Sequence, residues 1–324
     1  MAVRVLPSPP VRDTIRQVSE SSWLVGDLLL QRFPGLDLSA TWNDSAANAH
    51  YTLTDAPSPP PVSTLLPADS PVISKIYDAG DASAVFFIGH HVVLKIKCLH
   101  PSMTAEVTTL DFVRRQNRSF DVPNVIHHID LWNGDRSIVF YERLPGRTLM
   151  AAWPTLDDHW RDYYKLKIAR VCLELSQLKG DQVAGVDGKA LPEYFLAKRG
   201  QTSADNFEPA TVRAFCQACG MDVDDLVFYH TDLGPGNIMV EAEPKVGHIG
   251  IIDWEVAGFF PRAWIRTKFL VSSGMNLDRE VAEDRQCWRL DIARLLGDLG
   301  FETCVDQWTQ YKAALWLAAK HSGE

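Results

Sequence analysis

One ordered set of polar residues, between His230 and Asp253, limits what this chain can fold into more than any other feature. Asp232 and Asn237 lie five positions apart in the segment His230-Thr231-Asp232-Leu233-Gly234-Pro235-Gly236-Asn237. Sixteen residues after Asn237, a short apolar run ends in Asp253. Apolar runs on both sides of the turn-forming stretch 243–247 predict two paired strands. The pattern therefore predicts a hairpin that brings Asp253 across from Asn237.

The five-residue spacing is that of the loop H-R-D-x-x-x-x-N, which serves phosphoryl transfer. That reaction needs a carboxylate to orient the attacking hydroxyl, oxygen ligands for magnesium and a cation on the nucleotide phosphates. Mg²⁺ prefers carboxylate and amide oxygens, so Asp and Asn are the residue types expected at its site, and Asn237 and Asp253 could both reach one metal. Each aspartate alone could be a turn or strand-end residue, but the ordered set favours a phosphotransferase.

The stretch 71–144 is predicted to form a five-stranded antiparallel sheet with one helix. Alternating or continuous apolar runs separated by turn residues indicate the strands, and the spacing of Val107, Leu110 and Phe112 indicates a helix over 104–115. The expected strands cover 72–77, 85–88, 92–97, 125–131 and 137–141.

The flanking regions differ in character. After Pro145-Gly146 the chain is mostly helical, with helices expected over 157–179, 211–219 and parts of 262–319. Residues 1–70 form a Pro-rich extension in which Ser21 or Ser22 would cap a short helix ending before Pro34. We therefore expect an α+β protein in two lobes, with an extension at 1–70, a small nucleotide-binding lobe at 71–144 and a helical lobe at 145–324.

The motifs together resemble the aminoglycoside phosphotransferase and choline kinase-like family, which has a protein kinase-like fold. The family pattern H-x-D-x-x-x-x-N followed by I-D-[WF]-E is matched by His230 to Asn237 and by Ile252-Asp253-Trp254-Glu255. Upstream, Val93-Leu94-Lys95-Ile96 resembles the strand that carries the phosphate-binding lysine. Tyr141-Glu142-Arg143-Leu144-Pro145-Gly146 resembles the hinge segment. The resemblance covers residues 71–270.

The resemblance implies a role for each matched position. Asp232 would be the catalytic base or would orient the acceptor hydroxyl, and Asn237 and Asp253 would bind Mg²⁺. Lys95 would hold the α- and β-phosphates of ATP, positioned by Glu106. The remaining nucleotide contacts would come from the backbone of Glu142, Arg143 and Leu144 at the purine edge, and from the phosphate loop (Asp78–Ala84), where Ser83 would contact phosphate.

Several assignments leave alternatives open. Lys97 lies on the same side of its strand as Lys95, so periodicity alone does not choose between them. Asp111 is an alternative to Glu106. The phosphate loop contains one glycine, Gly80, and lacks G-x-G-x-x-G. His230 is expected to fix the loop backbone and not to act as an acid or base.

The acceptor is expected to be a hydroxyl of a small molecule, such as an aminoglycoside, a choline-like amine or a secondary metabolite. A catalytically silent binding protein is one alternative. A protein kinase is another, disfavoured because Trp254-Glu255 replaces Phe-Gly and because the A-P-E segment is absent.

Composition excludes other classes of function. A net charge of −9 without a run of Lys or Arg argues against nucleic-acid binding. No apolar run is long enough for a transmembrane span. The first residues lack the apolar region of a signal peptide and the cysteines are expected to be reduced, so a cytoplasmic location is expected. Among six cysteines, only Cys216 and Cys219 form C-x-x-C, and without further ligands two buried free thiols are favoured over a zinc site.

Overall fold

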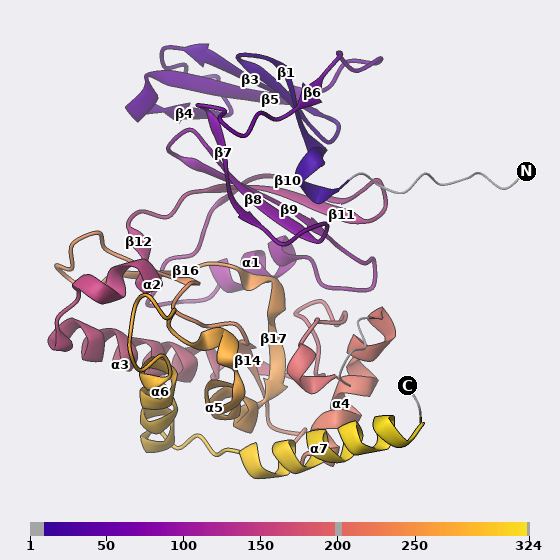
Figure 1. Cartoon of the computed structure of the whole chain (residues 1–324), viewed down its shortest axis with the longest axis vertical. Helices are drawn as coiled ribbons and strands as arrows, with labels where there is room; N and C mark the ends of the chain where they lie inside the picture. Colours follow the sequence, from indigo (N-terminus) through magenta and orange to yellow (C-terminus); the bar gives the residue numbers. More distant parts are fainter. Residues whose placement is uncertain (1–9, 198–202, 323–324) are drawn as a thin grey trace, which may run out of the picture. The chain divides into compact units, whose positions relative to one another are not determined.

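The computed structural model describes residues 10–197 and 203–322 (Figure 1). Contacts divide the chain into two compact units. The first runs to Pro101 and includes Asn124–Arg143, and the second comprises Ser102–Pro123 and the chain from Leu144 onward.

The first unit contains the predicted five-stranded antiparallel sheet, with strand order β10-β11-β9-β8-β7. Its strands are β7 (Ile73–Asp78), β8 (Ser83–Ile88), β9 (Val92–Cys98), β10 (Val125–Trp132) and β11 (Arg136–Glu142). In β9, Leu94 and Ile96 are buried in the core, while Lys95 and Lys97 lie on the opposite, half-buried face. The expected alternation and the strands themselves are confirmed.

The N-terminal region differs from its prediction, because residues 15–65 form a second antiparallel sheet and not a short helix. Its strand order is β4-β5-β3-β2-β1-β6. The strands are β1 (Ile15–Ser19), β2 (Ser22–Val25), β3 (Leu28–Pro34), β4 (Trp42–Asp44), β5 (Ala49–Asp55) and β6 (Thr64–Leu65).

The helix prediction for this region was wrong because Gly26-Asp27 divides the apolar stretch into two strands. Val25 pairs with Leu28, so Gly26-Asp27 is a two-residue hairpin turn, and Gly26 has a φ of 60°. Gly followed by Asp between apolar runs favours such a turn. The hairpin signal was therefore present in the sequence.

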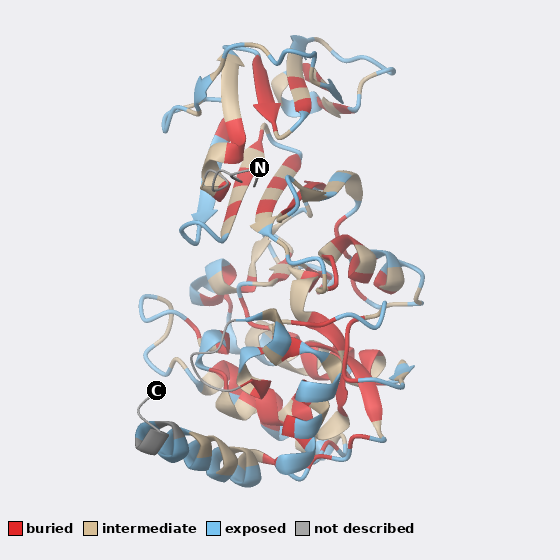
Figure 2. Cartoon of the chain, turned by 90° about the vertical axis from the view of Figure 1, so that its right-hand side faces the viewer, coloured by how far each residue is buried: buried red, intermediate tan, exposed pale blue. Residues whose placement is uncertain are grey.

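The two sheets of the first unit share one hydrophobic core. Trp23, Leu30 and Tyr51 from the N-terminal sheet belong to the same buried cluster as Phe86 and Ile96 of the five-stranded sheet. Figure 2 shows buried and partly buried residues alternating along strands of the five-stranded sheet, as in β8 and β9. The N-terminal sheet is thus a packed part of the nucleotide-binding unit predicted from the sequence.

Asp44 adds a polar connection between these sheets. Its side chain is fully buried and accepts hydrogen bonds from the N–H groups of Ala47 (3.1 Å) and His90 (2.9 Å). His90 lies in the turn between β8 and β9, and the next residue, His91, accepts a 2.7 Å bond from the N–H of Arg143. Asp44 therefore anchors the turn that also bonds the hinge segment.

The second unit is mainly helical and contains two three-stranded sheets. Its helices are α1 (Glu106–Arg114), α2 (Leu149–Ala152), α3 (Asp158–Leu175), α4 (Pro209–Ala218), α5 (Arg262–Val271), α6 (Cys287–Asp298) and α7 (Val305–Ser322). Its sheets have the orders β12-β15-β16 and β13-β14-β17. The strands are β12 (Arg147–Thr148), β13 (Lys179–Gly180), β14 (Leu226–His230), β15 (Ile238–Val240), β16 (Ile249–Ile251) and β17 (Ala257–Pro261).

Local sequence signals set the ends of these helices. The carboxylate of Asp157 accepts the N–H of Trp160 and so caps α3, which ends at Leu175, before the expected limit of 179. After α4, Gly220 has a φ of 71° and the N–H of Met221 bonds the Cys216 carbonyl, as in a glycine-terminated helix. Cys216 and Cys219 are both buried free thiols, as expected.

Large aromatic side chains fill the core of the second unit. Trp254, Trp264 and Trp288 are fully buried, and the ring of Trp288 packs edge-on against that of Trp153. Core packing therefore accounts for these tryptophans. In the described part of the chain, no helix is both long and apolar enough to span a bilayer.

Candidate active site

The loop that the sequence predicts to be catalytic, residues 231–237 (the catalytic loop), joins β14 to β15 within the second unit. Strand β14 is buried along its whole length and pairs with β17, which places His230 opposite Ala257. The hydroxyl of Thr231 donates to the Val256 carbonyl at 2.9 Å. The entry to the loop is therefore fixed on a buried sheet.

Asp232 and Asn237 contact each other across the loop. The side-chain amide of Asn237 donates to the backbone carbonyl of Asp232 at 2.8 Å and to its Oδ2 at 2.9 Å. Both amide hydrogens are thus directed at Asp232, which leaves Asn237 Oδ1 as the atom that can ligate a cation. Two turn bonds, from Gly234 N–H to Asp232 and from Asn237 N–H to Gly234, tighten the loop.

His230 links the catalytic loop to the second signature segment. Its fully buried ring bonds the Ile252 carbonyl through Nε2 (3.1 Å), while Nδ1 accepts the N–H of Asp232 (3.2 Å). A ring that donates through one nitrogen and accepts through the other is neutral. Burial lowers the pKa of His230, although the nearby charge of Asp232 opposes the shift. This contact pattern fits the expected backbone-fixing role.

Asp253 follows the hairpin β15–β16, as predicted. Ile238 pairs with Ile251, and the N–H of Ile252 donates to the Asn237 carbonyl at 3.0 Å. Asp253 itself has a φ of 65°, a left-handed conformation that few non-glycine residues adopt. The chain then enters the 3₁₀ helix η6 (Trp254–Val256). This abrupt turn places the Asp253 carboxylate at the end of the hairpin strand, one residue from the Asn237 backbone contact.

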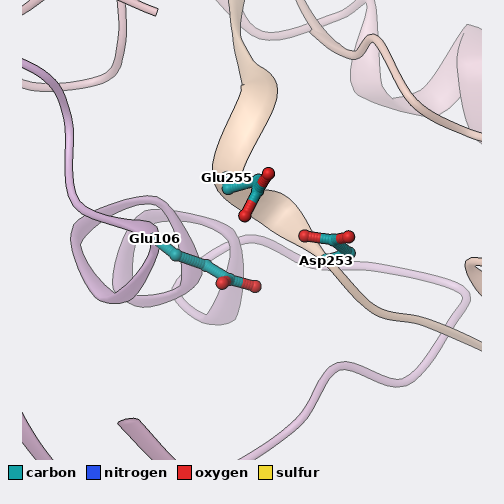
Figure 3. A group of neighbouring side chains, drawn as sticks. All are labelled: Glu106, Asp253 and Glu255. Atoms are coloured by element: carbon teal, nitrogen blue, oxygen red, sulfur yellow. The ribbon is translucent and has the colours of Figure 1, made fainter. Parts of the chain in front are cut away.

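Three carboxylates meet beside this turn. Oxygen atoms of Glu106, Asp253 and Glu255 lie within 4.8 Å of one another, and Figure 3 shows Glu106 reaching from α1 toward the segment that carries the other two. Glu106 also accepts the N–H of Trp254 at 2.9 Å. Hard oxygen donors in such proximity suit a divalent cation such as Mg²⁺. The position of the Asp253 carboxylate therefore fits the metal role that the sequence suggested, and the metal role of Asn237 stays a prediction.

Two further elements border the catalytic loop. The N–H of Met150 in α2 donates to the Pro235 carbonyl at 2.9 Å, and the loop residue Gly234 lies against Met275 in the 3₁₀ helix η7 (Ser273–Met275). The sequence carried no signal for either neighbour. Glu255 stood inside the matched motif, but its position in the carboxylate cluster could not be predicted.

The remaining predicted site residues lie on both units. Lys95 and Ser83 belong to the first unit, at the half-buried face of β9 and at the start of β8. Glu106 lies in the second unit, where it accepts the N–H of Trp254, and Asp111 is exposed. The pairing of Lys95 with Glu106 stays a prediction.

Two backbone N–H groups of the predicted hinge segment are already hydrogen-bonded within the protein. The N–H of Glu142 donates to Asn124 at 2.8 Å and the N–H of Arg143 donates to His91 at 2.7 Å. Neither group is therefore available to a purine without rearrangement. Leu144 lines a pocket of about 470 Å³ beside Met239 and Gly250, and the described lining includes none of Asp232, Asn237 or Asp253.

A family model described as the phosphotransferase enzyme family matches residues 77–286. This range contains Lys95, Glu106, Asp232, Asn237 and Asp253 but excludes the N-terminal sheet. No curated protein matches the chain.

Among solved structures, the chain is similar to the GDP complex of an aminoglycoside 2'-phosphotransferase-IIIa mutant. The identity is 14%, with 74% of this chain and 80% of that chain covered and a TM-score of 0.47. It is also similar to an aminoglycoside-3'-phosphotransferase of type VIII, with 15% identity, coverage of 74% and 94%, and a TM-score of 0.44.

The family model covers well over half of the chain, and its range spans a loop in which Asp232, Asn237 and His230 are joined by hydrogen bonds. The chain belongs to the phosphotransferase enzyme family.

Proposed function

We propose that this protein transfers the γ-phosphoryl group of ATP to a hydroxyl of a small molecule in a Mg²⁺-dependent reaction. The observation that carries the proposal is the hydrogen-bonded pair of Asp232 and Asn237, which His230 connects to the segment preceding Asp253. Carboxylate and amide oxygens at these positions are what phosphoryl transfer requires of a protein.

Asp232 would orient the acceptor hydroxyl and take its proton as the new O–P bond forms. Its Oδ2 is engaged by Asn237, so Oδ1 is the atom that would meet the hydroxyl. The bond from Asn237 restricts rotation of the carboxylate and keeps Oδ1 in one direction. Precise placement matters because most of the catalysis of phosphoryl transfer comes from positioning and electrostatics.

Asn237 Oδ1 and the Asp253 carboxylate would hold Mg²⁺, with Glu106 and Glu255 close to Asp253. The ion, when bound, would neutralise charge on the phosphate oxygens. From the first unit, Lys95 would bind the α- and β-phosphates and Ser83 would contact phosphate, while the backbone at Leu144, which belongs to the second unit, would meet the purine edge.

A small acceptor is favoured over a protein because of the chain path after Asp253. The 3₁₀ helix η6 is followed directly by β17, in which Ala257 pairs with His230. The chain therefore returns to the buried sheet within one helical turn. Protein kinases carry a long activation segment at this point, between D-F-G and A-P-E.

The proposal is tested by screening a library of amines, sugars and antibiotics for acceptor-dependent ATP consumption. Asp232→Asn should lower kcat by at least about 100-fold, the scale of general base catalysis, and leave Mg·ATP affinity nearly unchanged. Asp158→Asn, at an exposed position on α3, is the matched control and should keep full activity. An active acceptor that Asp232→Asn phosphorylates at the wild-type rate would exclude the assigned role. Nucleotide binding without any turnover would instead favour the catalytically silent alternative.

A further inference from the structure

Arg12 reaches from the N-terminal region to the phosphate loop. It lies in the 3₁₀ helix η1 (Val11–Thr14), which leads into the first strand of the N-terminal sheet. Its Nη1 donates to the Gly80 carbonyl at 3.1 Å and to the Asp78 carboxylate at 3.4 Å, and Nη2 lies 3.5 Å from the Asp81 carboxylate. One guanidinium therefore contacts three residues of the loop, Asp78, Gly80 and Asp81.

The backbone that carries Arg12 is held firmly. Val11 and Ile15 on either side are fully buried in the core shared by the two sheets. Thr14, also buried, accepts a 2.6 Å hydrogen bond from Arg136 in β11. Arg12 therefore projects from a fixed base, and its contacts restrain the loop more than those of a surface arginine on a mobile segment would.

The phosphate loop has few other restraints. Residues 79–82 are exposed, and Gly80 has a φ of 64° with no atom within 4 Å of where a side chain would begin. Within the loop, the Ala79 N–H bonds Ser83 and the Ala82 N–H bonds Ala79. On the far side, Cys98 donates to the Ala82 carbonyl through its N–H at 2.8 Å and to the Asp81 carbonyl through its thiol at 3.3 Å. Among the described residues, Arg12 supplies a long-range hydrogen bond to the Gly80 carbonyl.

Charge gives Arg12 a second effect. The loop carries two carboxylates, Asp78 and Asp81, which would repel the phosphates of a nucleoside triphosphate. The hydrogen bond from Lys75 and the charges of Lys75 and Arg12 hold the pKa of Asp78 below its usual range, so this carboxylate is ionised at neutral pH. Lys75 and Arg12 together offset the two negative charges. Removing Arg12 would leave the loop with net negative charge facing the phosphates.

We propose that Arg12 is a positioning residue for nucleotide binding, by which the N-terminal sheet holds the phosphate loop in place and neutralises it. The nucleotide part of this inference rests on the proposed function, whereas the ordering of the loop does not. Arg12 acts through Gly80, Asp78 and Asp81 and has no direct role in the reaction. The N-terminal sheet, which lies outside the matched family region, thereby gains a role in substrate binding.

The first measurement is hydrogen exchange of the full-length protein without nucleotide. Arg12→Ala should speed exchange at the Ala79 and Ala82 amides. Arg16→Ala is the matched control, because Arg16 lies on β1 of the same sheet but bonds Ser63. It should leave exchange in residues 79–82 unchanged. Equal protection of these amides in Arg12→Ala and wild type would overturn the inference, whatever the protein binds.

The second measurement compares Mg·ATP with adenosine by titration calorimetry. Arg12→Ala should weaken Mg·ATP binding about fivefold, the scale of a partly exposed ion-pair network, and leave adenosine binding within about twofold. Arg12→Lys should recover part of the loss because it keeps the charge, although it cannot reproduce the forked contact. An equal loss for both ligands would overturn the positioning role and indicate general destabilisation. Faster loop exchange in a protein that binds neither ligand would refute the proposed function and the nucleotide role of Arg12, leaving only loop ordering.

Discussion

Replacing His230 with phenylalanine tests whether one buried ring holds the catalytic loop together. The substitution keeps a ring of similar size next to Trp254, whose ring centroid lies 4.9 Å away. It removes the hydrogen bond from Nε2 to Ile252 and the bond from the Asp232 N–H to Nδ1. Because the packing is preserved, any loss of stability should come from the two lost hydrogen bonds.

The size of the effect follows from burial. A buried donor or acceptor left without its partner costs about 1–3 kcal/mol, and His230→Phe leaves one of each. The free energy of unfolding should therefore fall by about 3 kcal/mol. For a unit of this size, each kcal/mol lowers the midpoint of thermal unfolding by roughly 2–4 °C, so the midpoint should fall by about 6–12 °C. His159→Phe, an exposed position on α3, is the control and should shift stability by less than about 0.5 kcal/mol.

The pH dependence gives an independent readout of the same ring. Burial lowers the pKa of His230 in the folded protein below its unfolded value of about 6.5. The unfolded state therefore binds the proton more readily, and acid favours unfolding. The contribution of neutral His230 to the free energy of unfolding is fully present above about pH 6.5, and it is lost as the pH falls through the pKa of His230 in the folded protein. Thermal midpoints measured from pH 7.5 downward should fall less steeply in His230→Phe. A variant as stable as wild type, with the same pH slope, would refute the role assigned to His230.

Three further substitutions address other parts of the molecule. Asp44→Ala should lower the free energy of unfolding by about 3 kcal/mol, because two buried N–H groups lose their acceptor. Burial raises the pKa of Asp44, but hydrogen bonds from His90 and Ala47 outweigh burial and hold the pKa of Asp44 below its usual value. The stability that the ionised carboxylate contributes is therefore present at neutral pH and is lost as the pH falls through the pKa of Asp44 in the folded protein. Urea unfolding at a series of pH values checks this, and an unchanged midpoint at pH 7 would contradict it. Asp253→Ala should weaken Mg²⁺-dependent ATP binding by about tenfold or more; titration with the same Mg²⁺ dependence as wild type would place the metal elsewhere. Lys95→Ala should cost far more activity than Lys97→Ala, and the reverse order in kinetic assays would reassign the phosphate-binding lysine.

The parts of the fold that could be predicted are those encoded by local patterns. Alternation in β9 and the apolar runs of β8 and β11 predicted strands of the five-stranded sheet. This worked because the order of apolar and polar residues within each strand determines which of its side chains are buried. The contact between Asp232 and Asn237 is also local, because the two residues lie only five positions apart.

The carboxylate cluster could not be predicted, because it depends on contacts distant in sequence. Glu106 reaches Trp254 across 148 positions, and only the tertiary fold brings α1 to the turn after Asp253. The resemblance assigned Glu106 to Lys95, which left its proximity to Asp253 and Glu255 unanticipated. A sequence pattern can name such a residue as functional, but its neighbours depend on packing.

The N-terminal sheet shows how a local pattern can mislead when the partner is remote. Trp23 to Leu30 contains enough apolar residues for a buried helix or for two strands, and the choice depends on what the segment packs against. A helix buries one stripe of side chains, whereas Trp23, Val25, Leu28 and Leu30 all enter one core with residues of the five-stranded sheet. Pairing as a hairpin lets them share a single face, because strand side chains alternate and the two-residue turn restores the register. Packing against the five-stranded sheet therefore favours a hairpin over a helix in this segment. The same packing fixes η1 and directs Arg12 to the phosphate loop. The region for which the sequence indicated no chemistry therefore contacts the segment that is predicted to bind the nucleotide phosphates.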